Sequence, residues 1–142
     1  MIKISKKLLS TLEDAARQAS RSAYAPYSNF PVGAALLVED GDIYVGCNVE
    51  NASFGLTNCA ERSALYTAVA DGRGRGDFAA LLIYTPGQAI HPPCGACRQV
   101  LCEFLTPDTF IYSSCDSGET IAWTMDELLP DSFVMPESGV DA

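Results

Sequence analysis

The sequence predicts an α/β domain in which about five strands form a mixed sheet with helices on both faces. The first observation is that segments with helical periodicity alternate with short apolar segments along the 142 residues. The second is the length, which suits one domain with a hydrophobic core better than two. The third is a hydrophobic content of 48%, which argues against disorder over most of the chain. We therefore expect residues 1–142 to form a single domain.

The N-terminal part predicts a helix followed by a loop. The stretch opens with Ser5, and apolar residues recur with helical spacing from Leu8 to Ala19. Residues 24–31 contain two prolines, which indicates a loop. This loop carries three aromatic side chains, so it either packs on the core or binds a ligand.

An antiparallel hairpin is expected next. Residues 32–38 are small and apolar, residues 39–42 can turn, and residues 43–48 can return as the partner strand. Asn48 and Glu50 lie where the second strand ends, a position at which pockets collect polar side chains. The alternative is a turn that is held by Asn side chains.

The second half alternates helices and strands, and strands joined through helices are expected to run parallel. Thr57 or Asn58 can cap a helix that stops near Gly72. Thr124 followed by Glu127 forms a capping-box pattern. The other expected elements are a surface loop at 73–77, a buried strand at 78–85, a helix from 94 to about 105, strands at 109–113 and 120–123, a short helix at 124–129 and a frayed tail from 136 onward.

The composition narrows the classes of function. The formal net charge is −9 and the basic residues are scattered, which argues against nucleic acid as a partner and allows a small neutral molecule. No apolar run is long enough to cross a bilayer, and acidic residues interrupt the N-terminal apolar stretch, so we expect neither a membrane partner nor a signal peptide. The expected location is the cytoplasm, where six cysteines are more typical of metal binding or catalysis than of disulfides.

Two short stretches carry the chemistry, and each is expected to begin a helix. If both helices start at the same sheet edge, both N-termini point at one spot. Cys59, Cys94 and Cys97 would then offer three thiolates to one Zn²⁺ and leave the fourth position for water, as in catalytic zinc sites. Glu61 is placed to move protons on and off that water. The stretches are Asn58-Cys59-Ala60-Glu61-Arg62 and Pro93-Cys94-Gly95-Ala96-Cys97-Arg98-Gln99.

Other interpretations of these residues stay open. Glu61 can instead cap its own helix, and His91 can serve as the fourth ligand of a closed structural site, although the two prolines after it stiffen the loop. Cys102 lies off the helical face of the paired cysteines and is expected in the core. Cys47 and Cys115 lack ligand spacing and are expected to be structural.

Charge balance adds a further candidate. Three thiolates on Zn²⁺ leave a net charge of about −1, which weakens the pull of the ion on its water. Arg62 follows Glu61 directly and can offset this charge by donating hydrogen bonds to a ligand sulfur. Arg98 and Gln99 are lesser candidates, and the alternative for Arg62 is an ordinary surface charge.

The pattern of a ligand two residues before Glu, followed by Pro-Cys-x-x-Cys, resembles the signature of zinc-dependent nucleobase deaminases. Five blocks then resemble the cytidine deaminase family in its small, three-cysteine form, in the family's order and over most of the chain from Tyr24 to Phe133. The blocks are Pro26-Tyr27-Ser28-x-Phe30-Pro31-Val32-Gly33-Ala34, Cys47-Asn48-Val49-Glu50-Asn51-Ala52, Cys59-Ala60-Glu61-Arg62, Pro93-Cys94-Gly95-Ala96-Cys97-Arg98-Gln99-Val100 and Glu127-Leu128-Leu129-Pro130-x-x-Phe133.

This resemblance implies a three-layer α/β/α fold assembled as a homotetramer. It implies hydrolytic deamination of cytidine and deoxycytidine to uridine and deoxyuridine, with release of ammonia, as a step of pyrimidine salvage. One Zn²⁺ per chain would be bound by Cys59, Cys94 and Cys97, and Glu61 would shuttle protons.

The resemblance also implies substrate contacts within and between subunits. Phe30 would face the pyrimidine, and the Ala60 backbone would help to hold it. Asn48 and Glu50 would bind the ribose hydroxyls. The positions implied to complete pockets across subunits are Ala52 and Phe54, and Phe133 would also reach a pocket. Phe54 stands where many relatives carry Tyr, so the hydrogen bond from that hydroxyl is missing here.

Two rival functions stay open. One is deamination of another aminopyrimidine nucleoside, such as a blasticidin-type antibiotic, and the other is a non-catalytic module stabilised by zinc. The pair Asn48 and Glu50 favours a ribose-bearing substrate, because a sugar that fails to pair them strands buried polar groups at a cost of roughly 1–3 kcal/mol each.

Overall fold

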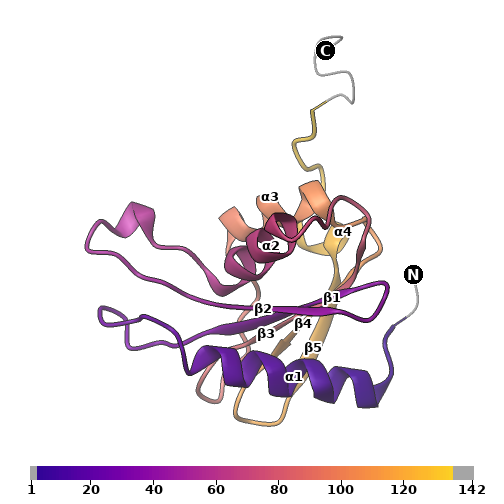
Figure 1. The fold of residues 1–142 in the computed structure, drawn as a ribbon. Coiled ribbons are helices and arrows are strands. Elements are labelled where there is room, and N and C mark those ends of the chain that lie inside the picture. Colours follow the sequence, from indigo (N-terminus) through magenta and orange to yellow (C-terminus); the bar gives the residue numbers. More distant parts are fainter. Residues whose placement is uncertain (1–2, 136–142) are drawn as a thin grey trace.

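A five-stranded sheet in the order β2-β1-β3-β4-β5 forms the middle layer of the computed structural model (Figure 1). β3 and β4 are parallel, and all other neighbouring pairs are antiparallel. The predicted mixed sheet of five strands is confirmed, and so is the predicted hairpin. The strands are β1 (Gly33–Val38), β2 (Ile43–Cys47), β3 (Phe78–Tyr84), β4 (Phe110–Ser114) and β5 (Thr120–Thr124).

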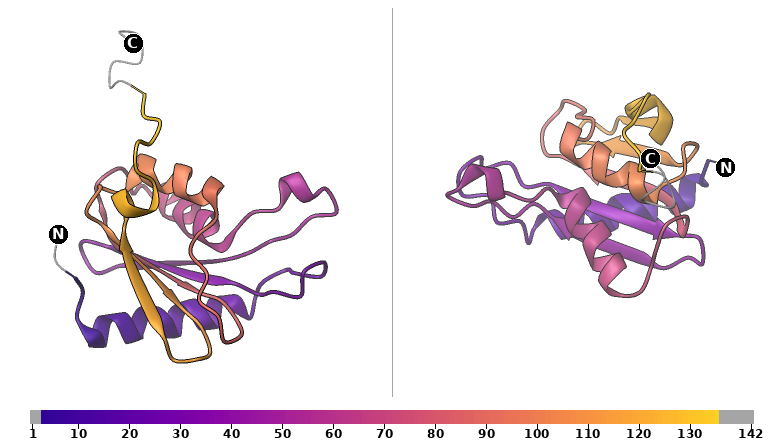
Figure 2. Two further views of the ribbon diagram at one scale, coloured as in Figure 1. Left: turned by 180° about the vertical axis from the view of Figure 1, so that it is seen from behind. Right: turned by 90° about the horizontal axis from the view of Figure 1, so that it is seen from above.

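Helices cover both faces of this sheet, as the views from behind and above also show (Figure 2). The helix α1 (Lys6–Ser20) packs on one face, where Leu12 and Ala16 are buried among residues of β1 and β3. The helices α2 (Ala60–Ala70), α3 (Gly95–Phe104) and α4 (Met125–Leu128) share a second buried cluster on the other face. The result is the three-layer α/β/α fold that the family resemblance implied.

The structure describes residues 3–135, and the frayed tail expected from 136 onward lies outside them. Within the described residues, no helix is both long and apolar enough to cross a membrane.

Two glycines let helices lie directly on the sheet. A Cβ built on Gly33 would lie 1.8 Å from the carbonyl oxygen of Ala16, and one built on Gly46 would lie 2.6 Å from the carbonyl oxygen of Ala60. Real Cβ atoms do not approach other atoms this closely, so only glycine, which has no side chain, fits at each position. For α2, this contact sets how close the first turn of the helix sits to β2.

The capping box predicted at Thr124 is confirmed, and the cap predicted for the helix after Asn58 is wrong. The Ser5 hydroxyl accepts a hydrogen bond from the backbone N–H of Leu8, and Thr124 and Glu127 form the expected capping box. The prediction that Thr57 or Asn58 caps α2 is wrong, because Cys59 is the N-cap residue. The chain reaches α2 in extended form, with Asn58 bridged to Val49, so the helix starts one residue later.

The loop predicted at 73–77 is present, and its first residue is tied down. Arg73 forms an ion pair of 2.7 Å with Asp40 and a second ion pair with Asp42, both in the turn between β1 and β2. Its Nε also donates to the Tyr44 hydroxyl. The end of α2 is therefore fastened to the β1–β2 turn.

Two segments project together from one side of the sheet (Figure 1). One is the predicted loop at 24–31, and the other carries a 3-10 helix, η1 (Phe54–Leu56), which the sequence did not predict. The rings of Tyr27 and Phe54 meet edge to face at 5.9 Å and hold the segments side by side.

Candidate active site

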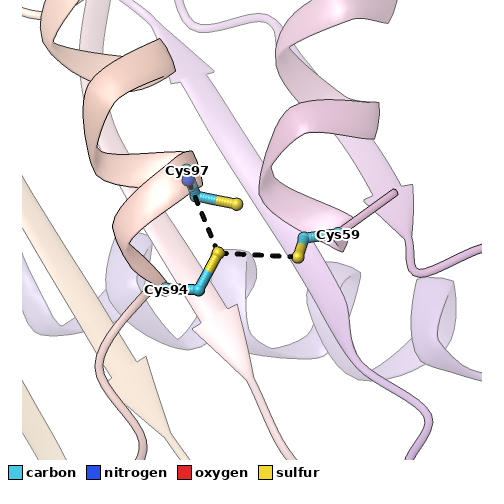
Figure 3. A group of neighbouring side chains, drawn as sticks. All are labelled: Cys59, Cys94 and Cys97. Atoms are coloured by element: carbon cyan, nitrogen blue, oxygen red, sulfur yellow. Dashed lines mark hydrogen bonds between the residues drawn. The ribbon is translucent and has the colours of Figure 1, made fainter. Parts of the chain in front are cut away.

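The first turns of α2 and α3 bring three cysteines together (Figure 3). Cys59 is the N-cap residue of α2, Cys94 is that of α3, and Cys97 lies in the first turn of α3. Their Sγ atoms all lie within 4.8 Å of one another, and those of Cys59 and Cys94 are 3.7 Å apart. The prediction that both helix starts point at one spot is confirmed.

This geometry fits Zn²⁺. Tetrahedral zinc with Zn–S bonds of about 2.3 Å places its sulfur ligands about 3.8 Å apart. The 3.7 Å between Cys59 and Cys94 matches that spacing, and all six cysteines are free thiols. In the described part of the chain, the cluster consists of the three cysteines without His91, whose imidazole instead meets the Phe30 ring edge to face at 5.5 Å. The geometry therefore favours three protein ligands over the closed four-ligand site.

The pKa values of the cysteines favour the binding of a cation. Hydrogen bonds from the Cys97 thiol and from Arg62 lower the pKa of Cys59 to about 5. The pKa of Cys97 is raised, because its thiol proton is shared with the Cys59 sulfur and because the side chain is buried. A cation can replace that shared proton. The Arg62 guanidinium donates to Cys59 Sγ at 3.4 Å, where the charge argument placed it.

Glu61 lies in the first turn of α2, two residues after Cys59. Its side chain is only 4% exposed. Burial raises the pKa of this carboxyl group to about 7, and the negative charge of Cys59 adds to the effect. A carboxyl group that titrates near neutral pH can both accept and return a proton. Burial also argues against the alternative that Glu61 is merely a helix-capping side chain at the surface.

A cavity of about 410 Å³ opens beside Glu61. Its lining joins Cys59 of the cysteine cluster to Ser28 and Phe30 of the projecting loop. The predicted site residues that line it are Phe30, Asn48, Glu50, Cys59, Ala60 and Glu61. A second cavity of similar volume shares Glu50 with the first and is also lined by Tyr27 and Phe54. We call Cys59, Cys94, Cys97 and Glu61 the sulfur end of the site, and Tyr27, Glu50 and Phe54 the loop end.

The polar side chains after β2 hold the projecting loop as well as line the cavity. Asn48 accepts from the backbone N–H of Val32 and donates to the carbonyl oxygen of Phe30, both at 2.9 Å. Glu50 accepts from the backbone N–H of Tyr27 at 2.9 Å and from the Ser28 hydroxyl at 2.5 Å. Hydrogen bonds from Ser28 and Tyr27 hold the pKa of Glu50 below its usual value. The segment after β2 therefore matches both expectations: its polar side chains line a pocket, and they also hold the neighbouring loop by hydrogen bonds.

The remaining predicted residues lie outside the main cavity. Phe54 is 75% exposed, and Phe133 is 69% exposed. Ala52 and Phe133 line neither cavity. Cys102, Cys47 and Cys115 lie outside the cysteine cluster, as predicted.

Sequence reasoning missed one buried polar residue of the cavity wall. Thr85 directly follows β3 and lines the cavity together with Ile83. The available signal was its place at the carboxyl end of an inner strand, where ligand-binding residues of α/β proteins gather.

Comparison with known proteins settles the family. Residues 6–113 match the model described as "Cytidine and deoxycytidylate deaminase zinc-binding region". A cytidine deaminase of Halalkalibacterium halodurans is 49% identical over 116 residues, which are 82% of this chain and 86% of the relative. The chain belongs to the cytidine deaminase family.

Solved structures of this cytidine deaminase family have the same fold. The cytidine deaminase of Burkholderia pseudomallei aligns with a TM-score of 0.86 and 45% identity, over 92% of this chain and all of that chain. The cytidine deaminase of Mycobacterium tuberculosis aligns with a TM-score of 0.75 and 40% identity, over 89% of this chain and 98% of that one. The predicted fold class is thereby confirmed.

Proposed function

We propose that this chain, as one domain of residues 1–142, is a zinc-dependent hydrolase that converts cytidine and deoxycytidine to uridine and deoxyuridine with release of ammonia. One observation carries the proposal: three sulfurs lie at zinc spacing, and one of them, that of Cys59, lines a cavity of nucleoside size together with the buried carboxyl group of Glu61. Family membership supports the same reaction, because the similar relatives named above are cytidine deaminases.

Cys59, Cys94 and Cys97 would hold the ion. When bound, Zn²⁺ supplies a Lewis acid that lowers the pKa of a coordinated water from about 16 towards about 7. Glu61 accepts a proton from the water that attacks ring carbon C4 and returns it to ring nitrogen N3. It then delivers a second proton from the new C4 hydroxyl to the amine, the C4–N bond breaks, and ammonia leaves. Arg62, through its hydrogen bond to Cys59, offsets the negative charge of the three thiolates.

The cavity wall orients a nucleoside. Phe30 would face the pyrimidine and the Ala60 backbone would help to hold it, next to Glu61. Asn48 and Glu50 would bind the ribose hydroxyls through the donor and acceptor sites that their hydrogen bonds to the loop do not use. A sugar that failed to pair Glu50 would leave a desolvated charge, so a ribose-bearing substrate is favoured.

The charges of the site favour a nucleoside over a nucleotide. None of the described residues that line the two cavities is Lys or Arg, and Glu50 lines both. A 5′-phosphate would therefore lie near a carboxylate and lack a cationic partner.

We further propose that the loop end is completed by another copy of the chain in a homotetramer. The exposure of three large apolar side chains supports this: Phe54 and Leu56 of η1 and Phe133 are all more than two-thirds exposed in a single chain. Exposed large apolar side chains, such as those of Phe54 and Leu56 on the projecting segment, are typical of an interface. Phe54 and Ala52 would reach a neighbour's pocket, as the family resemblance implied, and Phe133 would do so from the C-terminal side.

An absorbance assay tests the function. Purified zinc-loaded protein should convert cytidine and deoxycytidine to the uridine products and leave deoxycytidine 5′-phosphate almost unchanged. Zinc-loaded protein that produces no uridine would overturn the proposal, and equal rates on nucleoside and nucleotide would overturn the charge argument. Light scattering on the same sample should give the mass of four chains.

A further inference from the structure

The floor of the main cavity contains one buried hydroxyl group without a protein partner. Thr85 is 5% exposed, and within the described residues its Oγ1 makes no hydrogen bond. Thr85 nevertheless lines the cavity together with Cys59 and Glu61. Leaving a buried hydroxyl unpaired is costly, so a group that enters this cavity is the natural partner.

The backbone fixes where this hydroxyl lies. The Thr85 N–H donates to the carbonyl oxygen of Ser114 at 3.1 Å, which extends the β3–β4 ladder by one residue. Side chains alternate along a strand, so Thr85 is on the same face as Ile83. Ile83 packs in the buried cluster that contains Ala60 and Cys97. Thr85 therefore lies on the face that carries the reacting groups, one step beyond Ile83 toward the edge.

The neighbouring strand shows that not every hydroxyl on this floor is available. Ser113 of β4 donates to the carbonyl oxygen of His91 at 2.8 Å and thereby holds the segment before α3. Thr85 has no such structural role in the described chain. The Ser113 hydroxyl therefore fixes the cavity wall, and the Thr85 hydroxyl remains available to a group in the cavity.

We propose that Thr85 is a substrate-contacting residue whose hydroxyl group forms a hydrogen bond with the substituent on C4 of the pyrimidine. This inference rests on the proposed function. The C4 edge changes character in the reaction, because the amine of cytidine donates hydrogen bonds and the carbonyl of uridine accepts them. A hydroxyl both accepts and donates and can rotate between the two. Thr85 thus accepts from the substrate amine and donates to the product carbonyl without moving the backbone.

Variants of Thr85 and a matched control test this contact. T85V keeps the shape and removes the hydroxyl, whereas T85S keeps the hydroxyl. S114A is the control, because Ser114 also has a buried, unpaired hydroxyl but lies on the opposite face of the sheet, where side-chain alternation places it. We expect T85V to lower kcat/KM for cytidine by roughly 10- to 100-fold, with T85S within about threefold and S114A within about twofold of wild type.

Equilibrium binding separates this contact from a general loss of structure. T85V should weaken inhibition by uridine to a similar extent as it lowers kcat/KM. It should leave the affinity for the riboside of 2-pyrimidinone, which has hydrogen in place of the amine, within about twofold. Melting temperature and zinc content check that each variant is folded and loaded. If T85V does not fold, T85A takes its place.

The outcomes distinguish this inference from the proposed function. A wild-type protein that makes no uridine overturns both. An active wild type with T85V at full kcat/KM overturns the Thr85 contact alone. Equal weakening of uridine and of the 2-pyrimidinone riboside also overturns it, because the hydroxyl would then act on another part of the nucleoside.

Discussion

The sulfur end and the loop end of the cavity are built in opposite ways. At the sulfur end, Cys97 is fully buried and Glu61 nearly so, and both lie in the first turns of helices packed on the sheet. At the loop end, Tyr27 and Phe54 are exposed on segments that project away from the sheet. A single chain therefore fixes the groups that we propose to react and leaves the proposed sugar-binding end open.

This difference separates two requirements of the reaction. Proton transfer and metal binding need side chains fixed to within fractions of an ångström, which regular elements provide. A pocket that admits and releases a nucleoside needs access, which projecting loops provide. Changes at the sulfur end should therefore abolish turnover, and changes at the loop end should alter affinity and assembly.

The largest effect is expected from C97A, which removes the buried sulfur ligand. Zinc content should fall from about one ion per chain to near zero, and turnover should fall about 1,000-fold or more. C102A is the matched control, because Cys102 lies on the same helix outside the cluster. Metal analysis and the uridine assay measure both. Full zinc in C97A would contradict the three-sulfur site.

The next effect is expected from G46A, which touches no reacting group. The new Cβ would collide with the backbone of Ala60 and Ala64, so the first turn of α2 must move. Displacing Glu61 by about 1 Å should lower kcat by roughly 100-fold. G74A, which meets only a distant side-chain atom, is the control and should remain within about twofold. If G46A kept full activity and melting temperature, the close packing of α2 on β2 would not position the site.

At the loop end, E50Q should act on binding. Glu50 accepts hydrogen bonds from Tyr27 and Ser28, and an amide replaces one of its acceptor oxygens with a donor. We expect KM for cytidine to rise roughly tenfold, with a smaller change in kcat. Steady-state kinetics separate the change in KM from the change in kcat. A loss confined to kcat would place Glu50 in the chemical step instead.

F54A should have the smallest effect on turnover and a visible effect on assembly. Removing an aromatic side chain that is 75% exposed costs a single chain little, but it removes contact area from an interface. KM should rise about three- to tenfold, and dissociation on dilution should begin at higher protein concentration. Light scattering over a dilution series measures this. A wild-type protein that is monomeric and fully active would contradict the cross-subunit pocket.

The two ends also differ in how far the sequence could predict them. Cys59, Glu61 and the Cys94–Cys97 pair were identifiable because ligand chemistry permits few spacings. The capping box of Thr124 and Glu127 was identifiable because capping is local. The cap of α2 was mispredicted because the bridge between Val49 and Asn58 keeps Asn58 extended, and helical periodicity does not reveal such a bridge.

Contacts between distant elements account for what the sequence did not reveal. The requirement for Gly46 arises from the approach of α2, and a glycine within a strand carries no sign of it. In the sequence, Thr85 looks like the end of a buried strand. Only the folded structure shows that it lines the cavity and that its hydroxyl has no partner among the described residues. The role proposed for Phe54 depends on a neighbouring copy, about which the periodicity of one chain says nothing.

The most direct test of the central claim is the zinc content and turnover of E61Q, compared with E103Q at an exposed site on α3. In the proposed function, the buried carboxyl group moves protons and does not hold the metal. E61Q should therefore keep about one zinc per chain while kcat for cytidine falls about 1,000-fold or more, and E103Q should match wild type. Retention of kcat in E61Q, or loss of its zinc, would contradict that account.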